Sequence, residues 1–219
     1  STFYGNHAPY GGALRGPFNI YDSEFDSNTA TDGNGGAIDV ATDKSLAYGL
    51  VLEFVNSNFT NNDAKGQRSD DRAQGGAIHI FEIQEVDMYN CICINNTADR
   101  GGAVDYYKMN ITYVDKCTFV NNNASSEGGG LAIFCSDSTF KDSVISNNNA
   151  GTDGGAIWVI GDNSKFINVT SNNNTASRGG SSYIEGSNTL VANSTFNNNS
   201  AIYNGTEESG RGGAIDVLG

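Results

Sequence analysis

The stretch SNFTNNDA at residues 57–64, which continues after a ten-residue insertion as GGAI at residues 75–78, contains the unit from which the whole chain is built. Asn-x-Ala recurs eight times without exception, and Gly-Gly follows each copy. The asparagines of this motif are Asn6, Asn28, Asn62, Asn96, Asn122, Asn148, Asn174 and Asn199. Internal repetition at a nearly constant period is typical of stacked architectures, so we predict one solenoid domain over residues 1–219.

The spacing of the motif alanines sets the size of one coil. Successive alanines are 22, 34, 34, 26, 26, 26 and 25 residues apart, which gives a basic coil of about 25 residues. After each Gly-Gly, apolar side chains alternate along the sequence, as at Ile38 and Val40. A period of two is typical of strands with one face inward, and Gly and Asn between the strands supply turns with positive φ. These features predict an all-β fold, a parallel β-helix of about eight coils.

The repeat columns also predict what fills and stiffens the rod. The residue three positions before each motif Asn is Phe in five copies, and Cys93, Ile145 and Ser171 replace it in the others. We expect this column to stack in the core. The motif asparagines fall where this strand turns, and stacked Asn amides can bond to one another and to the turn backbone. We therefore expect them to form a structural ladder.

Three insertions lengthen the regular coil, at residues 42–49, 65–74 and 202–211. Insertions in a solenoid become surface loops, often near a binding face, although tolerated loop growth is the simpler explanation. The second insertion holds Asp70-Asp71, the only adjacent pair of Asp residues. Glycoside hydrolysis needs two carboxylates flanking the scissile bond, but a solvated charge cluster is the simpler reading of this pair. We expect no enzyme activity, no cofactor and no metal.

The charge of the chain bears on its partners. A formal net charge of −13 disfavours nucleic acid, which attracts Lys and Arg, and it disfavours adsorption to an anionic membrane. No apolar stretch approaches the ~20 residues of a membrane-spanning helix. The repeat begins at residue 1 and neither end carries a polar cap. We expect the rod to continue in a longer parent chain or to stack on other copies.

Outward positions just after each Gly-Gly-Ala form the candidate binding surface. Two neighbouring columns there collect His79, Phe81, Tyr107, Phe134, Trp158 and Tyr183. Exposed apolar patches usually mark a contact surface, and aromatic rings on a flat sheet suit stacking on sugars. We call these six residues the aromatic stripe. The alternatives are that a loop or a neighbouring domain covers the stripe, or that the strand parity is shifted by one residue.

Cysteines and sequons point to an extracellular environment. Cys91 and Cys117 share a column in adjacent coils, within reach of a disulfide; four buried free thiols are the alternative. Cys93 replaces a core Phe and reads as an apolar filler. Sequons for N-glycosylation begin at Asn58, Asn95, Asn110, Asn123, Asn168, Asn173, Asn193, Asn198 and Asn204. The repeat generates several of these by itself, and an Asn that caps a turn needs no sugar.

The pairing of Phe-x-x-Asn with Gly-Gly-Ala-Ile resembles the repeats of chlamydial polymorphic outer-membrane proteins and of adhesin-like surface proteins of methanogenic archaea. Phe-x-x-Asn is intact at 3–6, 25–28, 59–62, 119–122 and 196–199, and Gly-Gly-Ala with Ile, Leu or Val is intact at 11–14, 35–38, 75–78, 101–104, 154–157 and 212–215. The resemblance implies a right-handed parallel β-helix at a cell surface, with adhesive or structural duty.

Together these features favour a non-catalytic extracellular rod that acts as a spacer or adhesin-like module. Its expected partners are other copies stacked end to end, or a protein or glycan on a host or partner cell surface. One alternative is the subunit of a head-to-tail filament, because unpaired strand edges favour stacking. The other is a polysaccharide-binding or polysaccharide-degrading β-helix.

Overall fold

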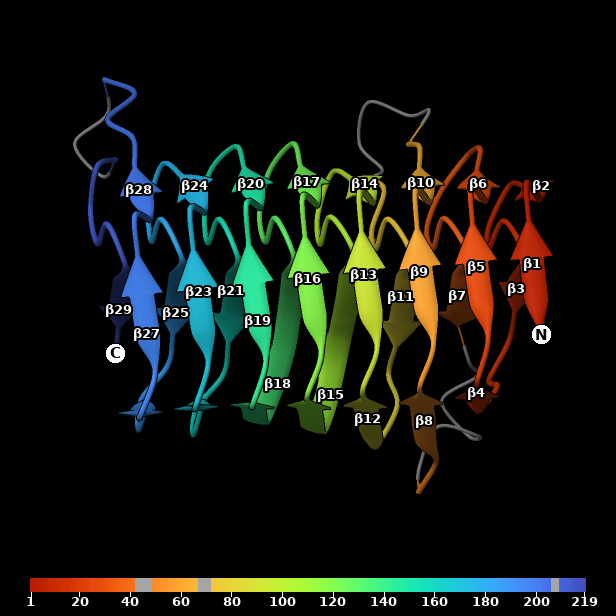
Figure 1. Ribbon diagram of the computed structural model, residues 1–219, viewed down its shortest axis with the longest axis horizontal. Coiled ribbons are helices and arrows are strands. Elements are labelled where there is room, and N and C mark those ends of the chain that lie inside the picture. Colours follow the sequence, from red (N-terminus) through yellow and green to blue (C-terminus); the bar gives the residue numbers. More distant parts are fainter. Residues whose placement is uncertain (42–48, 67–71, 206–208) are drawn as a thin grey trace.

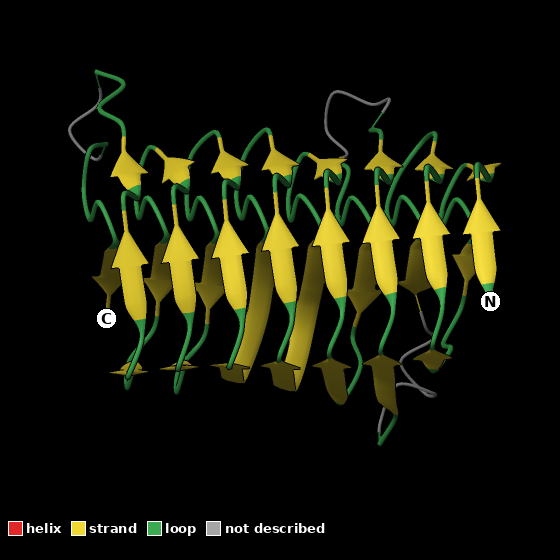
Figure 2. Cartoon of the chain, in the orientation of Figure 1, coloured by secondary structure: helices red, strands yellow, loops and turns green. Residues whose placement is uncertain are grey.

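The computed structural model describes residues 1–41, 49–66, 72–205 and 209–219. The three predicted insertions therefore lie partly outside the described residues, and the Asp70-Asp71 pair lies wholly outside them. Strands and turns make up the described chain, without a helix (Figure 2). In these residues no helix is long and apolar enough to cross a membrane.

Two stacks of short parallel strands carry the repeat motif. The first stack contains the Phe column, and its strands are β1 (Thr2–Tyr4), β5 (Glu24–Asp26), β9 (Asn58–Thr60), β13 (Ile92–Ile94), β16 (Thr118–Val120), β19 (Val144–Ser146), β23 (Thr170–Asn172) and β27 (Thr195–Asn197). The second follows each motif Asn, with β2 (His7–Ala8), β6 (Thr29–Ala30), β10 (Asp63–Ala64), β14 (Thr97–Ala98), β17 (Asn123–Ala124), β20 (Asn149–Ala150), β24 (Thr175–Ala176) and β28 (Ser200–Ala201). Eight strands in each stack agree with the predicted eight coils.

The third sheet lies behind the first two and has two parts. Its upper part begins at the Gly-Gly-Ala motif and contains β3 (Leu14–Arg15), β7 (Ile38–Ala41), β11 (Ile78–Phe81), the start of β15 (Val104–Asp115) and of β18 (Leu131–Lys141), β21 (Ile157–Ile160), β25 (Ser182–Glu185) and β29 (Ile215–Leu218). Its lower part contains β4 (Ile20–Tyr21), β8 (Val51–Val55), β12 (Glu85–Tyr89), the ends of β15 and β18, β22 (Lys165–Ile167) and β26 (Leu190–Ala192). A register shift after Tyr106 separates the two parts of β15.

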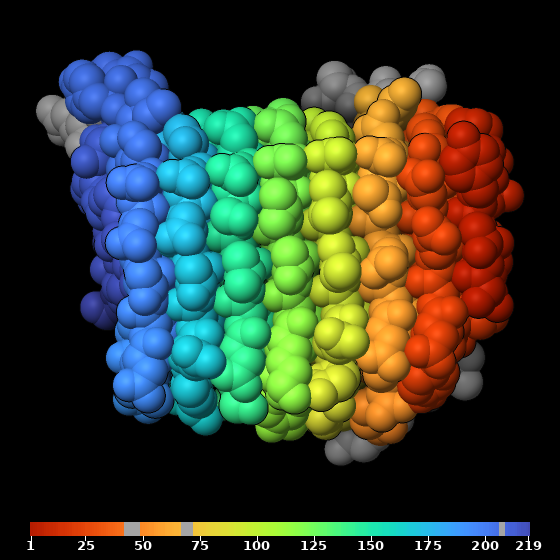
Figure 3. All heavy atoms as spheres, viewed as in Figure 1, coloured from red at the N-terminus to blue at the C-terminus, as the bar shows by residue number. Residues whose placement is uncertain are grey.

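The coils advance as a right-handed helix. In Figure 1 each coil rises through the front strands, crosses behind and descends through the third sheet, while the chain moves steadily away from its N-terminus. The space-filling view shows these coils as adjacent bands with continuous contact between neighbours (Figure 3). The predicted right-handed parallel β-helix is confirmed.

The glycine pair explains how the chain turns into the third sheet. Gly75 has φ +67°, which favours glycine. A Cβ on Gly76 would lie 2.0 Å from the backbone oxygen of Gly102 in the next coil. The second glycine of the pair is therefore required by close approach of successive coils.

The core lies between the first and third sheets. The Phe column stacks as predicted: Phe3 pairs with Phe25 and Phe25 with Phe59, with ring centroids 4.6 and 5.0 Å apart and nearly parallel planes. Cys93 continues the column in register. From the third sheet, alternate residues such as Ile78 and Ile80 pack against this column and are fully buried.

Each motif asparagine links two coils. Asn122 donates from Nδ2 to Asn148 Oδ1 of the next coil (3.0 Å) and to the Cys93 carbonyl of the previous one (3.0 Å). Its own Oδ1 accepts from the backbone N–H and from Nδ2 of Asn96, both at 3.0 Å. A backbone N–H can only donate, so this contact fixes which amide atom is the oxygen. Bonds of the same kind join the asparagines from Asn6 to Asn199.

Candidate functional site

The aromatic stripe occupies the predicted columns on the upper part of the third sheet. His79 pairs with Asp105, and Phe81 pairs with Tyr107. Trp158 pairs with Tyr183 in the same column as His79. Their neighbours in space are therefore those that the repeat predicted.

The predicted exposure of the stripe is wrong for half of it. His79, Trp158 and Tyr183 retain only 3%, 8% and 1% of their accessible surface. Phe81, Tyr107 and Phe134 are half-buried. Trp158 and Tyr183 form a second apolar cluster outside the main core, with Ala132.

Two arginines, Arg100 and Arg178, each directly before a Gly-Gly pair, cover several of these rings. The Arg100 guanidinium lies 5.1 Å from the Tyr107 ring centroid and 4.9 Å from that of Phe134. Arg178 lies 4.5 Å from the Tyr183 ring. Such cation–π contacts are worth most where they are desolvated. The stripe is thus largely an internal packing surface between the sheet and its own turns.

A buried ion pair holds the turn at Arg100 against the sheet. Arg100 pairs with Asp105, with Nε 2.5 Å from Oδ2 and Nη2 3.2 Å from Oδ1. Within the sheet itself, His79 Nδ1 on β11 lies 2.8 Å from Asp39 Oδ1 on β7, and both side chains are almost fully buried. Removing Arg100 would leave Asp105 as a buried uncompensated charge, which is strongly destabilising. We infer that these buried pairs stabilise the fold.

The lower part of the third sheet carries a different and accessible surface. Outward positions alternate with buried ones along β12 and β15: Val86 and Met88 point inward, and Asp87 and Tyr89 point outward. Tyr21, Tyr89 and Tyr113 retain 47%, 40% and 45% of their accessible surface. We call the outward residues of this region the tyrosine face: Tyr21, Glu53, Asp87, Tyr89, Tyr113, Asp115, Thr139 and Lys141.

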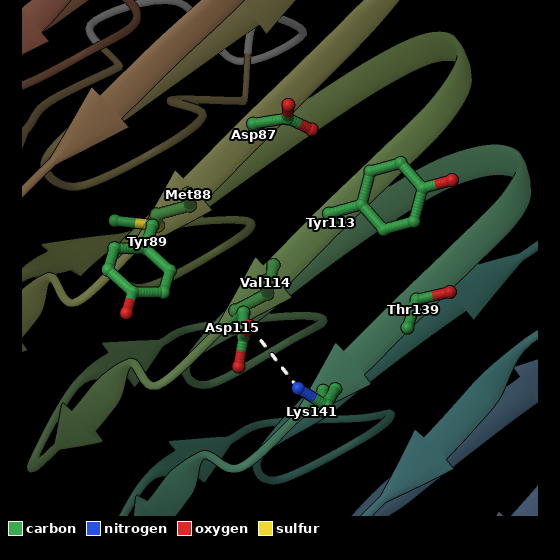
Figure 4. A pocket seen from close by; sticks show the side chains of 8 residues that line it. All are labelled: Asp87, Met88, Tyr89, Tyr113, Val114, Asp115, Thr139 and Lys141. Carbon is green, nitrogen blue, oxygen red and sulfur yellow. Dashed lines mark ion pairs between the residues drawn. The ribbon is translucent and has the colours of Figure 1, made fainter.

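A hollow of about 250 Å³ opens on the tyrosine face (Figure 4). Strand register places Asp87, Tyr113 and Thr139 side by side in one row, on β12, β15 and β18. The second row contains Tyr89, Asp115 and Lys141 on the same strands. The backbone at Met88 and Val114 passes between the rows and lines the hollow.

The two aspartates of the hollow, Asp87 and Asp115, have different electrostatic surroundings. Burial, followed by the nearby carboxylates of Glu85 and Glu53, raises the pKa of Asp87 above its ordinary value. Asp115 faces a cation instead, because Lys141 Nζ lies 3.5 Å from its Oδ2. Lys116 donates a hydrogen bond of 2.7 Å to the Tyr89 hydroxyl and lies over the Tyr89 ring. The hollow therefore offers both acceptors and donors within a few ångströms.

Sequence reasoning missed this surface. The signal was present in the segments EVDMY at 85–89 and ITYVD at 111–115, where Asp and Tyr alternate with other residues at period two. What the sequence did not supply was their relative register, which places Asp87 beside Tyr113 and Tyr89 beside Asp115.

The remaining predicted positions are spread over the rod. Each of the nine sequon asparagines is exposed. All four cysteines are buried free thiols, so the predicted Cys91–Cys117 bridge is absent from this structure. Cys91 Sγ instead contacts the carbonyls of Phe54 and Tyr89, and Cys117 Sγ contacts that of Met88. Over the described ranges, no group of three or more His, Cys, Asp or Glu side chains is placed to hold a metal ion.

Comparison with known proteins finds one family. Residues 22–41, 142–160 and 193–217 match a family model described as the Chlamydia polymorphic membrane protein repeat. Each match contains one motif asparagine, Asn28, Asn148 or Asn199, and the Gly-Gly-Ala motif that follows it. No curated protein and no solved structure matches the chain.

Proposed function

Because the chain is a β-helix of repeats of the chlamydial polymorphic membrane protein type, we propose that it is a non-catalytic, extracellular cell-surface rod that presents the tyrosine face for adhesion. The family of the repeat supports a surface location. The tyrosine face supports adhesion, and the asparagine ladder supports a mechanical role.

The rod is stiff because every coil is bonded to the next in the same way. The observation that carries the proposal is the unbroken asparagine ladder from Asn6 to Asn199. Each asparagine in its interior bonds to the coil before it and the coil after it, in a site shielded from water. Bending the rod would lengthen these bonds at several levels together, so the ladder resists bending.

The two aromatic surfaces of the third sheet differ in their accessibility. Arg100 and Arg178 of the same chain cover rings of the aromatic stripe. On the tyrosine face, by contrast, three tyrosines are 40–47% exposed. Aromatic residues are enriched in the buried parts of interfaces, which supports this face as the contact surface.

Two measurements on intact cells of the source organism test the proposal. Antibody raised against the purified chain should label unpermeabilised cells. Beads coated with the chain should retain partner cells, and the double variant Tyr89→Ala/Tyr113→Ala should lose retention while Tyr4→Ala, at an exposed tyrosine on β1 of the opposite side, should not. Labelling that requires permeabilisation would overturn the surface assignment, and equal retention by both variants would overturn the choice of face.

The two alternative functions have their own tests. Head-to-tail assembly predicts a mass that rises with concentration in size-exclusion chromatography with light scattering, and a monomer mass throughout would refute it. Polysaccharide cleavage predicts release of new reducing ends from soluble polysaccharides, which the non-catalytic rod should not produce.

Attachment of N-glycans is also a proposal. The nine exposed sequon asparagines leave room for it. Intact mass of the native protein, before and after deglycosylation, decides it; a mass equal to that of the bare chain would refute it.

A further inference from the structure

The hollow on the tyrosine face has an ordered chemical lining. Two tyrosines, Tyr89 and Tyr113, lie on one diagonal of a two-by-two arrangement on β12 and β15. Two carboxylates, Asp87 and Asp115, lie on the other diagonal. Each ring is thus flanked by an aspartate along its own strand and by another across the sheet.

Both carboxylates have an oxygen with no use in the fold. Asp87 Oδ1 and Asp115 Oδ1 are shielded from solvent and accept no hydrogen bond from the described residues. Buried acceptors without partners are costly, but these two oxygens are out of reach of a molecule in the hollow. A ligand would therefore meet each carboxylate through its Oδ2. The second oxygen of Asp115 is already paired with Lys141.

Donors lie in the same hollow. The Lys141 ammonium and the Thr139 hydroxyl line its far side on β18. A sugar hydroxyl donates one hydrogen bond and accepts others, so neighbouring hydroxyls can use the aspartates and the donors together. The C–H faces of a sugar ring are apolar and pack on aromatic rings, here those of Tyr89 and Tyr113.

We propose that this hollow binds one sugar residue of a neutral glycan, with its ring against Tyr89 or Tyr113 and its hydroxyls donating to Asp87 and Asp115. The volume of about 250 Å³ lies below the ~300–1,000 Å³ of pockets for drug-sized ligands, which suits a single sugar unit of a longer chain. The remainder of the chain would extend along the tyrosine face.

The charged side chains in and around the hollow disfavour charged polymers as ligands. Uronate or sulfate groups would meet Asp87 with Glu53 and Glu85 close by, on a chain of net charge −13. A basic peptide would satisfy the carboxylates but would meet the ammonium groups of Lys141 and Lys116. A neutral polyhydroxyl ligand satisfies acceptors and donors alike.

This inference deepens the proposed function and rests on it for the access of the face to glycans outside the cell. The binding itself is tested on the purified chain, so failure here leaves the surface location standing, and failure of cell labelling leaves glycan binding standing.

The test is affinity electrophoresis of the whole purified chain in native gels. The gels contain, in turn, dextran, hydroxyethyl cellulose, galactomannan, polygalacturonate or polylysine. The expected result is retardation by at least one neutral polymer, unchanged by added salt, with a loss of about tenfold in affinity for Tyr113→Ala. Retardation by none of the neutral polymers, or only by polygalacturonate or only by polylysine, would overturn the proposal.

Matched variants separate the site from the fold. Asp87→Asn keeps the shape but removes the charge that strengthens hydrogen bonds from hydroxyls, so it should weaken retardation. Tyr4→Ala removes a more exposed tyrosine from the opposite side and should leave retardation unchanged. All variants should give the circular dichroism spectrum of the parent chain. Equal retardation of Tyr113→Ala, Asp87→Asn and the parent would place any binding elsewhere and overturn the proposal.

Discussion

Replacing Asn122 by alanine should destabilise the rod by several kilocalories per mole, because this side chain is 1% exposed and takes part in four hydrogen bonds. Its loss leaves the buried backbone N–H of Asn96 without its acceptor, which costs ~1–3 kcal/mol. The other three bonds are worth ~0.5–1.5 kcal/mol each, and the lower value applies where the partner keeps a second bond, as Asn96 Nδ2 does with the Phe59 carbonyl. The sum is roughly 2.5–6.5 kcal/mol.

The neighbouring Asn123 is the matched control. It is exposed, and its Oδ1 accepts one side-chain hydrogen bond from Asn149. Asn123→Ala should therefore cost less than ~1 kcal/mol. Urea titrations followed by circular dichroism measure the difference from the shift in midpoint, provided that the slopes agree, since stacked repeats can lose two-state behaviour.

A second substitution, Asn122→Asp, tests the same hydrogen bonds through the pH dependence of stability. The new carboxylate keeps one acceptor for Asn96, but its second oxygen replaces the amide that donated to Asn148 and to the Cys93 carbonyl. Burial against two acceptors raises its pKa in the folded state. The destabilisation is therefore full above that raised pKa and is relieved as the pH falls toward the unfolded value. If Asn122→Ala and Asn123→Ala unfold at the same urea concentration, the ladder does not carry the stability assigned to it.

Three further predictions concern other features. Gly76→Ala should prevent folding of the coil, since its Cβ would lie 2.0 Å from the Gly102 oxygen. Gly49→Ala is the control, because its Cβ meets no atom within 4 Å and the substitution should cost only the ~1–3 kcal/mol of a strained φ. Soluble yield and thermal melting compare the two variants, and an equal effect would refute the close approach of coils as the reason for Gly76. Burial raises the pKa of Cys135 to about 11, so at neutral pH it should react with a thiol reagent only after denaturation, and a reaction as fast in the native chain would contradict its burial. Retardation by a neutral polysaccharide should weaken as the pH falls through the raised pKa of Asp87, because protonation removes the charged acceptor; an identical pH profile for Asp87→Asn would show that another group is responsible.

The sequence predicted the stacking of columns because the repeat itself states which residues are equivalent. Once Phe25 and Phe59 occupy the same place in successive coils, parallel pairing must bring them together, and the register confirms it. The same logic predicted the asparagine positions. A repeat is therefore informative about every property that depends on equivalence between coils.

Burial on the outer face depends on residues that are not equivalent between coils, and there the prediction failed. Tyr107 was assigned an outward position correctly, yet Arg100, from the turn before the Gly-Gly, covers it and pairs with the neighbouring Asp105. The corresponding position in the preceding coil is Gln74, a neutral side chain. Nothing in a periodic pattern states which turn residue folds back over a strand.

The tyrosine face was missed for a related reason. It lies in the part of the coil between Gly-Gly-Ala-Ile and the next Phe-x-x-Asn, where the repeat has no consensus. Asp87 and Tyr113 become neighbours only through the register of β12 with β15. The candidate binding residues of this rod therefore lie in the segment of the coil that the repeat motif does not cover.

The asparagine ladder also makes the rod electrically directional. At every step Nδ2 of one asparagine donates to Oδ1 of the asparagine in the following coil, never the reverse. Seven amide dipoles therefore point the same way along the long axis. Aligned hydrogen bonds polarise one another and strengthen by ~10–30% each. Every added coil would thus reinforce those before it, and a charged group would experience different fields at the two ends of the array.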